Sequence, residues 1–363
     1  MVIYVITFPQ VYTGGITALY QLCHSLNNIG LHAEIVFPMS ASSKIDKLIH
    51  KAYILYNCKH SFLSSISDNN KTTIIIPESM PKLVDKFRNS IKILYWLSVD
   101  HYVIRSLPYS HLDFVRYTLS KLVNFSPLSS MYIKLLHNSY LAEYVSRHLA
   151  KLNVPVPNVS MHIVQSRYAY EFLRSLGVQH QQVFFLHEPL EEDYLLQDIS
   201  YDGRDLGVAW NSRKAYPITL KIVRHLRKLS IPINPLDNVG KEKMRKILSR
   251  TRIFIDIGFH PGRDRPPREA VALGNIAVVN NHGGCFYYDD CMIEQPFKVD
   301  CYTEGRCNID PKKVAEDILY YMENYEYYYK KYFTKFRDYI LEEPKLYQKE
   351  IEQLAKILSD IIK

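Results

Sequence analysis

Short runs of apolar residues alternate along the chain with segments in which apolar residues recur every three or four positions. The short runs are rich in Ile, Val and Tyr and nearly continuous, which is typical of parallel strands covered on both faces. In segment 16–28, Ile16, Leu19 and Cys23 fall on one helical face, and Gly30 ends the pattern. The first half therefore opens as a βαβ unit. Its predicted strands are 2–8, 33–37, 72–77, 93–99, 162–165 and 183–186, with a further helix at 167–176.

A second alternating series begins after the polar segment 188–203, which carries Pro189 and Gly203 and is predicted to be an interdomain linker. We therefore expect two tandem Rossmann-like, doubly wound α/β domains, with ligands bound at the carboxyl ends of the strands in a cleft between them. The predicted strands of this series are 206–210, 253–257 and 276–280, and its helices are 218–229, 241–249 and 266–273. The expected organisation is an N-terminal domain at 1–187 with a helical insertion at about 103–150, a C-terminal domain at 204–335, and a final helix at 336–363 that packs back on the first domain.

Composition and charge narrow the class of partner. The chain is 47% hydrophobic and 23% charged, as in an ordinary globular protein, and its net charge is +8. That excess suits a nucleotide diphosphate or an anionic lipid surface. The aromatic and basic insertion 103–150 is expected to meet the acceptor or a membrane, and the alternative is a helical cap on the N-terminal core. Zinc-finger spacing and a basic tail are both missing, so no nucleic-acid partner is predicted.

The cysteines and the hydropathy pattern bear on the compartment. The six cysteines are scattered without a CxxC pair, so reduced thiols and no bound metal are expected. The first residues are predicted to form a strand rather than a signal peptide, and no apolar stretch is long enough for a transmembrane helix. A cytoplasmic protein, peripheral on the inner face of the cell membrane, is the expectation.

Two glycines, Gly14 and Gly15, lie between the first strand and the first helix. Paired glycines at this position let backbone N–H groups approach an anion or a sugar, although a tight turn alone also requires them. The dinucleotide fingerprint GxGxxG is not present, because a third glycine is missing and no acidic residue ends the second strand. This argues against a dehydrogenase.

A second polar motif follows the strand 206–210. Asn211, Arg213 and Lys214 lie at the carboxyl end of that strand and before a helix, where two cations suit a diphosphate. The alternative is a solvated charged turn.

The loop after strand 253–257 is dense in charge. Together with Asp256 it holds one His, a second Asp and three Arg between two apolar strands, which indicates either a ligand site or a salt-bridged loop. Asp264 is in position to cap the helix that begins with two prolines. The candidate binding residues here are His260, Gly262, Arg263, Asp264, Arg265, Arg268 and Glu269, followed after the next strand by Gly283 and Gly284.

This loop resembles the second domain of GT-B glycosyltransferases, which carries two glutamates separated by seven residues and, after a strand, a Gly-Gly turn. The matching positions are Gly262, Glu269, Ala270, Gly274, Gly283 and Gly284, and the resemblance covers most of the chain in order. Gly14-Gly15 matches the N-terminal glycine loop of that fold, and Arg213-Lys214 its diphosphate-binding cations. The run from His260 to Arg265 and the strand end Trp96–Asp100 are also similar to bacterial surface-polysaccharide glycosyltransferases.

The resemblance implies a nucleotide-sugar donor and no essential metal or other cofactor. Glu269, in the first turn of a helix, is expected to hold the ribose hydroxyls, with Arg268 and the helix N-terminus keeping it ionised. Pro261 stands where the family has its first glutamate, so His260 or Asp264 is the candidate to take that place. The choice between an inverting and a retaining mechanism stays open.

Polar residues also end the strands of the first domain. Glu78, Asp100 and His101 are expected to face the cleft, and Asp100 or His101 is the candidate general base, with His260 as the alternative. Capping of the next helix would equally explain Asp100.

The expected reaction is transfer of a sugar from a nucleotide-activated donor to a hydroxyl of a glycan or glycolipid, in bacterial cell-surface polysaccharide synthesis. Two alternatives stay open: a nucleotide-sugar epimerase of the same fold, and a catalytically silent sugar-binding homologue, which the loss of the first glutamate would favour. The donor nucleotide and sugar, the acceptor and the oligomeric state stay open as well.

Overall fold

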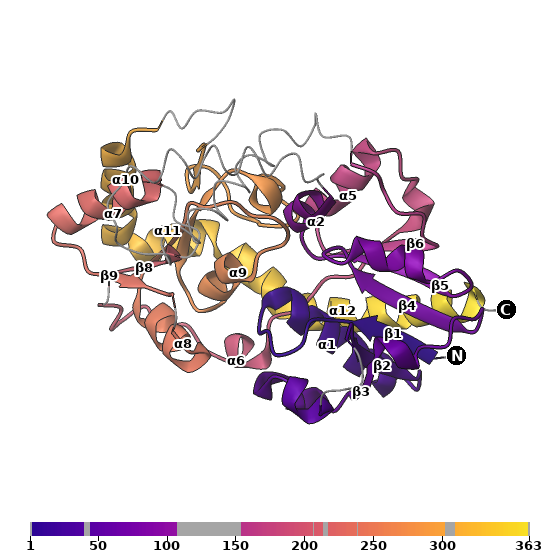
Figure 1. Ribbon diagram of the computed structural model, residues 1–363. Coiled ribbons are helices and arrows are strands. Elements are labelled where there is room, and N and C mark those ends of the chain that lie inside the picture. Colours follow the sequence, from indigo (N-terminus) through magenta and orange to yellow (C-terminus); the bar gives the residue numbers. More distant parts are fainter. Residues whose placement is uncertain are drawn as a thin grey trace, which may run out of the picture. The chain divides into compact units, whose positions relative to one another are not determined.

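The computed structural model describes residues 2–39, 44–106, 154–205, 207–212, 217–237, 239–301 and 309–361. The chain divides into two compact units (Figure 1). Unit 1 contains the described residues of 1–106, 155–189 and 343–363, and unit 2 those of 107–154 and 190–342. Beyond Ser106, the predicted insertion at 103–150 lies outside the described residues.

Unit 1 is built on a seven-stranded sheet with the order β3-β2-β1-β4-β5-β6-β7, in which every neighbouring pair is parallel. The predicted strands are confirmed, and one more is found at the edge. That strand, β3, escaped the sequence pattern because Lys59, His60 and Ser61 interrupt its apolar character. The strands are β1 (Val2–Ile6), β2 (Ala33–Phe37), β3 (Lys59–Phe62), β4 (Thr72–Pro77), β5 (Ile91–Trp96), β6 (Met161–Val164) and β7 (Val183–Phe185).

Helices cover both faces of this sheet. Alternate strand residues point to opposite faces, and one set, including Val5, Ile75 and Tyr95, packs in a core with α1 and the end of α12. On the other face Trp96 contacts Tyr102 of α2 and Phe172 of α5. The helices of this unit are α1 (Gly14–Asn28), α2 (Val99–Ser106), α5 (Arg167–Ser175) and the later part of α12 (Thr334–Ile361), with 3-10 turns η1 (Ile45–Leu48), η2 (Lys51–Tyr56), η3 (Leu63–Ser65), η4 (Pro81–Lys86) and η7 (His180–Gln182).

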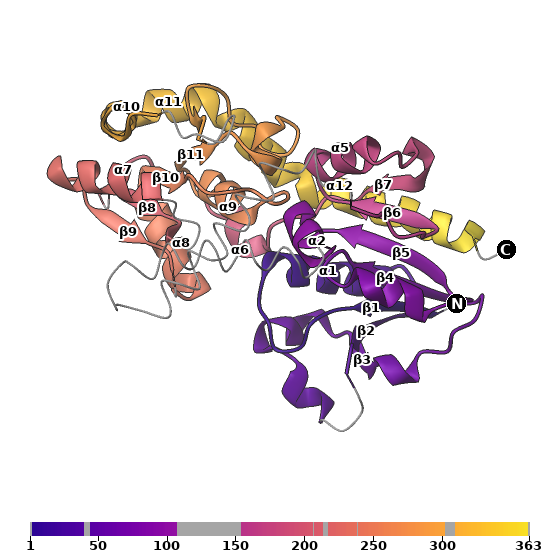
Figure 2. The same cartoon turned by 45° about the horizontal axis from the view of Figure 1, so that its top comes forward.

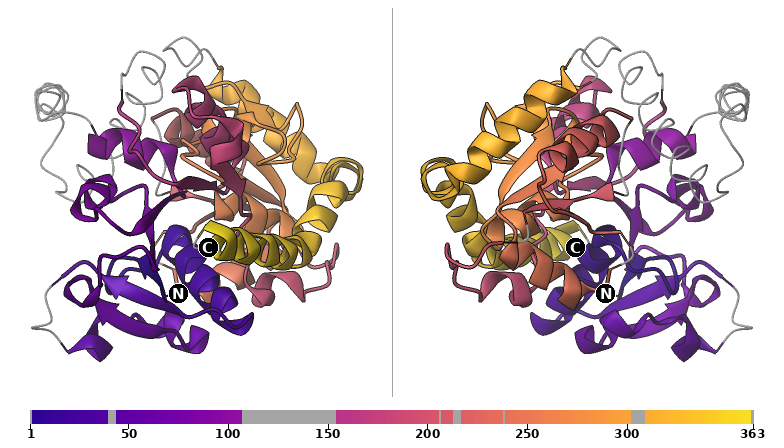
Figure 3. Two further views of the ribbon diagram at one scale, coloured as in Figure 1. Left: turned by 90° about the vertical axis from the view of Figure 1, so that its right-hand side faces the viewer. Right: turned by 90° about the vertical axis from the view of Figure 1, so that its left-hand side faces the viewer.

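The last helix completes the core of unit 1. From Tyr347 onward, α12 contributes Ile351, Leu354 and Leu358 to the cluster that contains Leu19 of α1. The two helices lie beside each other when the molecule is viewed along α12 (Figure 3). The chain end therefore stabilises a domain whose strands all lie before Leu186 in the sequence.

Unit 2 is built on a five-stranded parallel sheet with the order β12-β11-β10-β8-β9. Figure 2 shows its helices on either side of these short strands. The strands are β8 (Val208–Trp210), β9 (Ile233–Pro235), β10 (Ile253–Asp256), β11 (Ile276–Asn280) and β12 (Lys298–Val299). The helices are α6 (Glu192–Leu195), α7 (Pro217–Lys228), α8 (Lys241–Arg250), α9 (Arg265–Ala272), α10 (Pro311–Glu323), α11 (Tyr325–Tyr332) and the first part of α12, with the 3-10 turn η9 (Gly283–Phe286).

Both units have the doubly wound topology that the sequence predicts. In unit 1 the chain first builds outward from β1 to β2 and β3 and then returns to place β4 on the other side of β1. In unit 2 it builds from β8 to β9 and returns to β10. The fold is thus α/β with two tandem Rossmann-like domains, and each sheet has a switch point, at β1/β4 and at β8/β10, where such sheets bind ligands.

The predicted linker at 188–203 is wrong in part. The boundary between the units falls after Pro189, and α6 lies within the segment. Leu190 and Tyr194 are buried in the core of unit 2, which explains why this polar-looking segment is ordered structure.

The expectation of reduced thiols also needs correction, because Cys301 is disulfide-bonded, whereas Cys23, Cys58, Cys285 and Cys291 are free. Among the described helices, none has the length and apolar character needed to span a membrane.

Candidate functional site

A buried polar region of unit 2 lies at its switch point, beyond the carboxyl ends of β8 and β10. Asn211 follows β8 directly, and its Nδ2 donates to the carboxylate of Asp256 at the end of β10, at 2.8 Å. The N–H of Asn211 also continues the sheet by donating to the carbonyl of Ile255, at 2.9 Å. Two neighbouring strands thus deliver polar side chains to one point, as the sequence predicts for Asn211.

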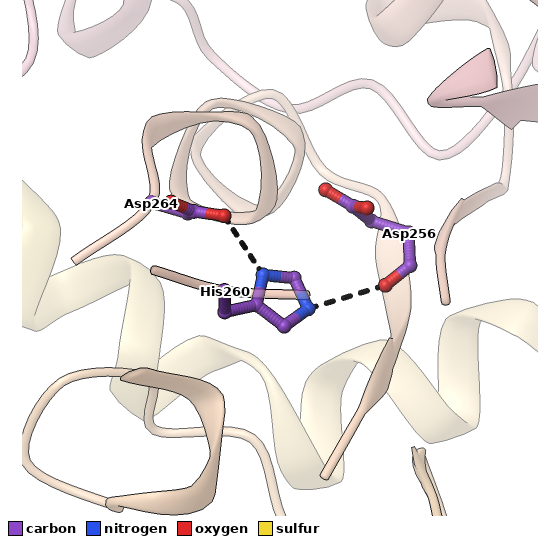
Figure 4. Close-up of side chains that lie close together, drawn as sticks. All are labelled: Asp256, His260 and Asp264. Atoms are coloured by element: carbon purple, nitrogen blue, oxygen red, sulfur yellow. Dashed lines mark hydrogen bonds and ion pairs between the residues drawn. The ribbon is translucent and has the colours of Figure 1, made fainter. Parts of the chain in front are cut away.

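His260 is the centre of the loop that follows β10. Its ring is completely buried, with Nδ1 2.9 Å from Asp264 Oδ2 and Nε2 3.2 Å from the backbone carbonyl oxygen of Asp256 (Figure 4). Asp264 stands at the N-cap of α9, yet its side chain makes no capping hydrogen bond. The expected cap is therefore wrong: the carboxylate turns to His260 instead and ties the two ends of the loop together.

Asp256, His260 and Asp264 form a group whose ligand-type atoms all lie within 4.8 Å of one another. Both ring nitrogens of His260 already face an oxygen acceptor in this arrangement. The group therefore acts as a cross-link in the loop, and a metal ion bound there would have to replace at least one of these hydrogen bonds.

Gly283 and Gly284 pack directly on this loop. The N–H of Gly284 donates to the His260 carbonyl at 2.8 Å. A side chain on Gly283 would collide with that carbonyl, one on Gly284 would collide with the carbonyl of Gly262, and Gly283 has a φ of 57°. The two backbones approach so closely that only glycine fits, and this packing accounts for the Gly-Gly turn without a ligand.

Glu269 lies in the second turn of α9, not in the first turn as expected, because the helix begins at Arg265, and it is 6% exposed. Its Oε1 accepts a hydrogen bond from Arg265 Nε at 3.3 Å, and the guanidinium of Arg265 also pairs closely with Glu191. Burial raises the pKa of Glu269, and the charge of Arg265 opposes that rise. Arg268, the cation expected from the sequence to favour the ionised form, also lowers this pKa, but Arg265 has the larger effect.

Two residues of this network escaped the sequence analysis. Glu191 precedes the short helix α6, and its Oε1 also accepts from Lys241 Nζ at 2.7 Å. Burial, together with the nearby Arg265, lowers the pKa of Lys241 to about 8. No periodic pattern marks either residue, because the contact joins segments that are far apart in sequence.

The other cations of the loop are also buried. Arg263 is 2% exposed and its guanidinium lies 5.5 Å from the ring centre of Tyr339, while Arg268 is 1% exposed. His282, which precedes the Gly-Gly turn and was not among the predicted site residues, has a pKa lowered to about 4 by burial and by His260. The region therefore combines fixed positive charge with a neutral imidazole. Arg213 and Lys214, the predicted phosphate ligands, lie outside the described residues.

Unit 1 carries the remaining predicted residues. Gly14 and Gly15 are the first residues of α1, with Thr13 at the N-cap. Asp100 is 1% exposed and accepts from the hydroxyl of Tyr168 at 2.9 Å, whereas His101 is exposed on α2. These two neighbours therefore differ sharply in environment, and a general-base role fits the buried, hydrogen-bonded Asp100 poorly.

Glu78 lies at the other switch point, directly after β4. Its carboxyl Oε2 accepts from the N–H of Leu97 at 2.9 Å, and its own N–H donates to the carbonyl of Tyr95 at 3.0 Å. The side chain is buried, and burial raises its pKa to about 8.

Comparison with known proteins agrees with this architecture. No protein-family model and no curated protein matches the sequence. Among solved structures, the chain is similar over almost its whole length to GT-B glycosyltransferases, and it has the GT-B fold.

Three such structures illustrate the similarity. Sucrose-phosphate synthase from Thermosynechococcus elongatus has a TM-score of 0.59 at 11% identity, over 99% of each chain. The pneumococcal O-GlcNAc transferase GtfA, solved with UDP and GlcNAc, has a TM-score of 0.54 at 9% identity, over 100% of this chain and 99% of its own. Anabaena HepE, solved with UDP-glucose, has a TM-score of 0.53 at 10% identity, over 98% of this chain and 100% of its own.

Proposed function

We propose that this protein is a glycosyltransferase that moves a sugar from a UDP-sugar to a hydroxyl group of a glycan or glycolipid. The observation that carries the proposal is the β8/β10 switch point of unit 2, where Asn211, the His260 loop and the start of α9 converge. Ligands of doubly wound sheets bind at this place. The choice of uridine is supported by the UDP and UDP-glucose in the similar solved structures of GtfA and HepE.

In this proposal Glu269 accepts hydrogen bonds from the two ribose hydroxyls, and Arg213 and Lys214 bind the diphosphate. Their positive charge would stabilise the diphosphate as its bond to the sugar breaks, which is the main catalytic demand of the reaction. Both ring nitrogens of His260 face oxygen acceptors within the loop, which suits a residue that holds the loop in shape rather than one that removes a proton.

The acceptor is proposed to be a glycan or glycolipid of bacterial cell-surface polysaccharide synthesis, on the similarity of the His260–Arg265 run and of Trp96–Asp100 to such enzymes. Association with an anionic membrane through residues 103–150 is part of the same proposal. Flotation of the protein with anionic and neutral vesicles at low and physiological salt tests it, because electrostatic binding requires the anionic lipid and weakens with salt.

The reaction is tested by incubating the protein with UDP-glucose and UDP-GlcNAc, with and without a mixture of bacterial polysaccharide fragments, and analysing all UDP-containing products. A glycosyltransferase releases UDP faster when acceptor is present. An epimerase converts the UDP-sugar into its epimer without acceptor and without releasing UDP. A silent homologue binds the UDP-sugar but produces neither, and either of these last two results contradicts the proposal.

A further inference from the structure

The switch point of unit 1 contains a buried carboxyl group with one of its oxygens anchored by the backbone. Glu78 follows β4, Gly15 lies in the first turn of α1, the helix that follows β1, and Leu97 follows β5. Leu97 contacts both of the other residues. Its N–H donates a hydrogen bond to Glu78 Oε2 at 2.9 Å, and its side chain packs so closely on Gly15 that a Cβ atom added there would lie 3.4 Å from Leu97 Cδ1. Glu78 is thus held where doubly wound sheets bind their ligands.

The surroundings of Glu78 favour its neutral form. The side chain is 2% exposed, and burial raises its pKa to about 8 even though the N–H of Leu97 favours the carboxylate. Titratable groups on the elements around β4 include Tyr4 on β1, Lys92 and Tyr95 on β5, Lys82, Asp85 and Lys86 on η4, Asp100 on α2, and Tyr347 and Glu350 on α12. Of these, Tyr95 is the one that interacts electrostatically with Glu78, and as a buried phenol it supplies no positive charge.

The position of the proton follows from the hydrogen bond. Oε2 accepts the hydrogen bond from Leu97, and the N–H of Glu78 itself also favours the carboxylate, so we assign the proton of the neutral acid to Oε1, which makes that oxygen a hydrogen-bond donor. Among the described residues, Glu78 has no side-chain partner. A ligand oxygen within hydrogen-bond distance of Oε1 would accept this proton.

We infer that Glu78 binds a hydroxyl group of the carbohydrate acceptor by donating a hydrogen bond from Oε1, with Leu97 as the positioning group. This inference rests on the function proposed above. A sugar hydroxyl suits the site because it accepts one hydrogen bond without carrying charge and can donate its own proton elsewhere. The first turn of α1, which adjoins the site through Gly15, contains no acidic residue that would compete for the ligand.

Infrared difference spectroscopy on the whole protein tests this inference. A carbonyl band of a protonated carboxyl is expected at pH 6.5, absent in Glu78→Gln and lost from the wild type above about pH 8. Addition of octyl glycosides of glucose, galactose, mannose or N-acetylglucosamine should shift the band for at least one sugar, and UDP should leave it in place. Asp68→Asn is the matched control, because backbone N–H groups and Ser90 lower the pKa of Asp68 to about 2 and its loss should leave the band unchanged.

Two results would overturn the inference: no Glu78-dependent band at pH 6.5, or a band that none of the four sugars shifts. Binding of UDP, measured on the same samples by calorimetry, separates this outcome from failure of the proposed function. If UDP binds but the band does not respond, the assignment of Glu78 is wrong while the donor site stands. If the band responds but UDP does not bind, the donor proposal is wrong instead.

Discussion

Replacement of Glu269 by Gln is the sharpest test of the donor site that a single side chain offers. Alanine would be a poor choice, because Glu269 Oε1 accepts from Arg265 and both residues are buried. Removing one partner of a buried ion pair destabilises a protein by about 3–5 kcal/mol, which would obscure any effect on binding. Glutamine keeps the size of the side chain and an acceptor oxygen for Arg265.

The expected effect on affinity follows from the proposed contact. If the carboxylate accepts both ribose hydroxyls, the variant, which retains one acceptor oxygen, loses one charge-assisted hydrogen bond with a net contribution of about 1.5–3 kcal/mol. The dissociation constants of UDP and of uridine should therefore both rise, by roughly 10- to 150-fold. The two ligands should lose affinity equally, since both contain the ribose.

Isothermal titration calorimetry on the intact protein measures both constants. Glu191→Gln is the matched control, because Glu191 pairs with the same Arg265 but is assigned no ligand contact, and its affinity for UDP should stay within about twofold of wild type. Unchanged affinity of the Glu269→Gln variant for both ligands would refute the ribose contact. A loss for UDP alone would place Glu269 near the phosphates instead.

Three further predictions concern the supports of the two sites. Gly283→Ala should destabilise the protein by more than about 1 kcal/mol in urea unfolding, because the added carbon collides with the His260 carbonyl and the backbone has a positive φ. Gly240→Ala, where the added carbon meets open space, should lose only a few tenths of a kcal/mol of stability. Equal losses in the two variants would contradict the packing argument. Asp264→Ala should lower the free energy of unfolding by about 1–3 kcal/mol, because it removes the hydrogen bond to His260. When His260 is already replaced by alanine, the same substitution should cost much less. Fully additive losses would mean that the two side chains act independently. The pKa of Glu78 is raised to about 8, so the stability of the wild type is greatest below the ordinary pKa of a glutamate and falls as the pH rises to 8. The stability of Glu78→Gln relative to the wild type should therefore increase between pH 5 and 8 by an amount on the order of a few kcal/mol. Parallel pH profiles of the two proteins in thermal unfolding would exclude the neutral acid.

The fold was predictable because its signals are local. Buried parallel strands such as β4 are continuous apolar runs, and helix boundaries carry their own chemistry, as at Asp310, whose side chain caps α10 through the N–H of Lys312. The strands that escaped prediction, β3, β9 and β12, all lie at or near sheet edges, where short length and polar residues remove the apolar pattern.

The site was predictable in its location but not in its contacts. The charged loop after β10 stood out because so many charged residues between two apolar strands require either ion pairs or a bound ligand. The residues that pair with the loop could not be predicted in the same way. Glu191, which pairs with Arg265, lies 74 positions away in the sequence, and Asp264 hydrogen-bonds to His260 instead of capping the helix. The spacing of Arg265 and Glu269, four positions apart on one helix, is the one contact of this network that the sequence alone could have indicated.

The central claim, a uridine diphosphate site in this chain, is tested most directly by the thermal stability of the whole protein in the presence of UDP, GDP, ADP and CMP. A ligand at 100 times its dissociation constant stabilises the native state by about 2.7 kcal/mol, which corresponds to a readily measured rise in the midpoint of unfolding. We predict a rise with UDP that increases with its concentration and exceeds the rise with each of the other nucleotides. An unfolding midpoint that none of the four nucleotides changes, at concentrations up to several millimolar, would contradict the account.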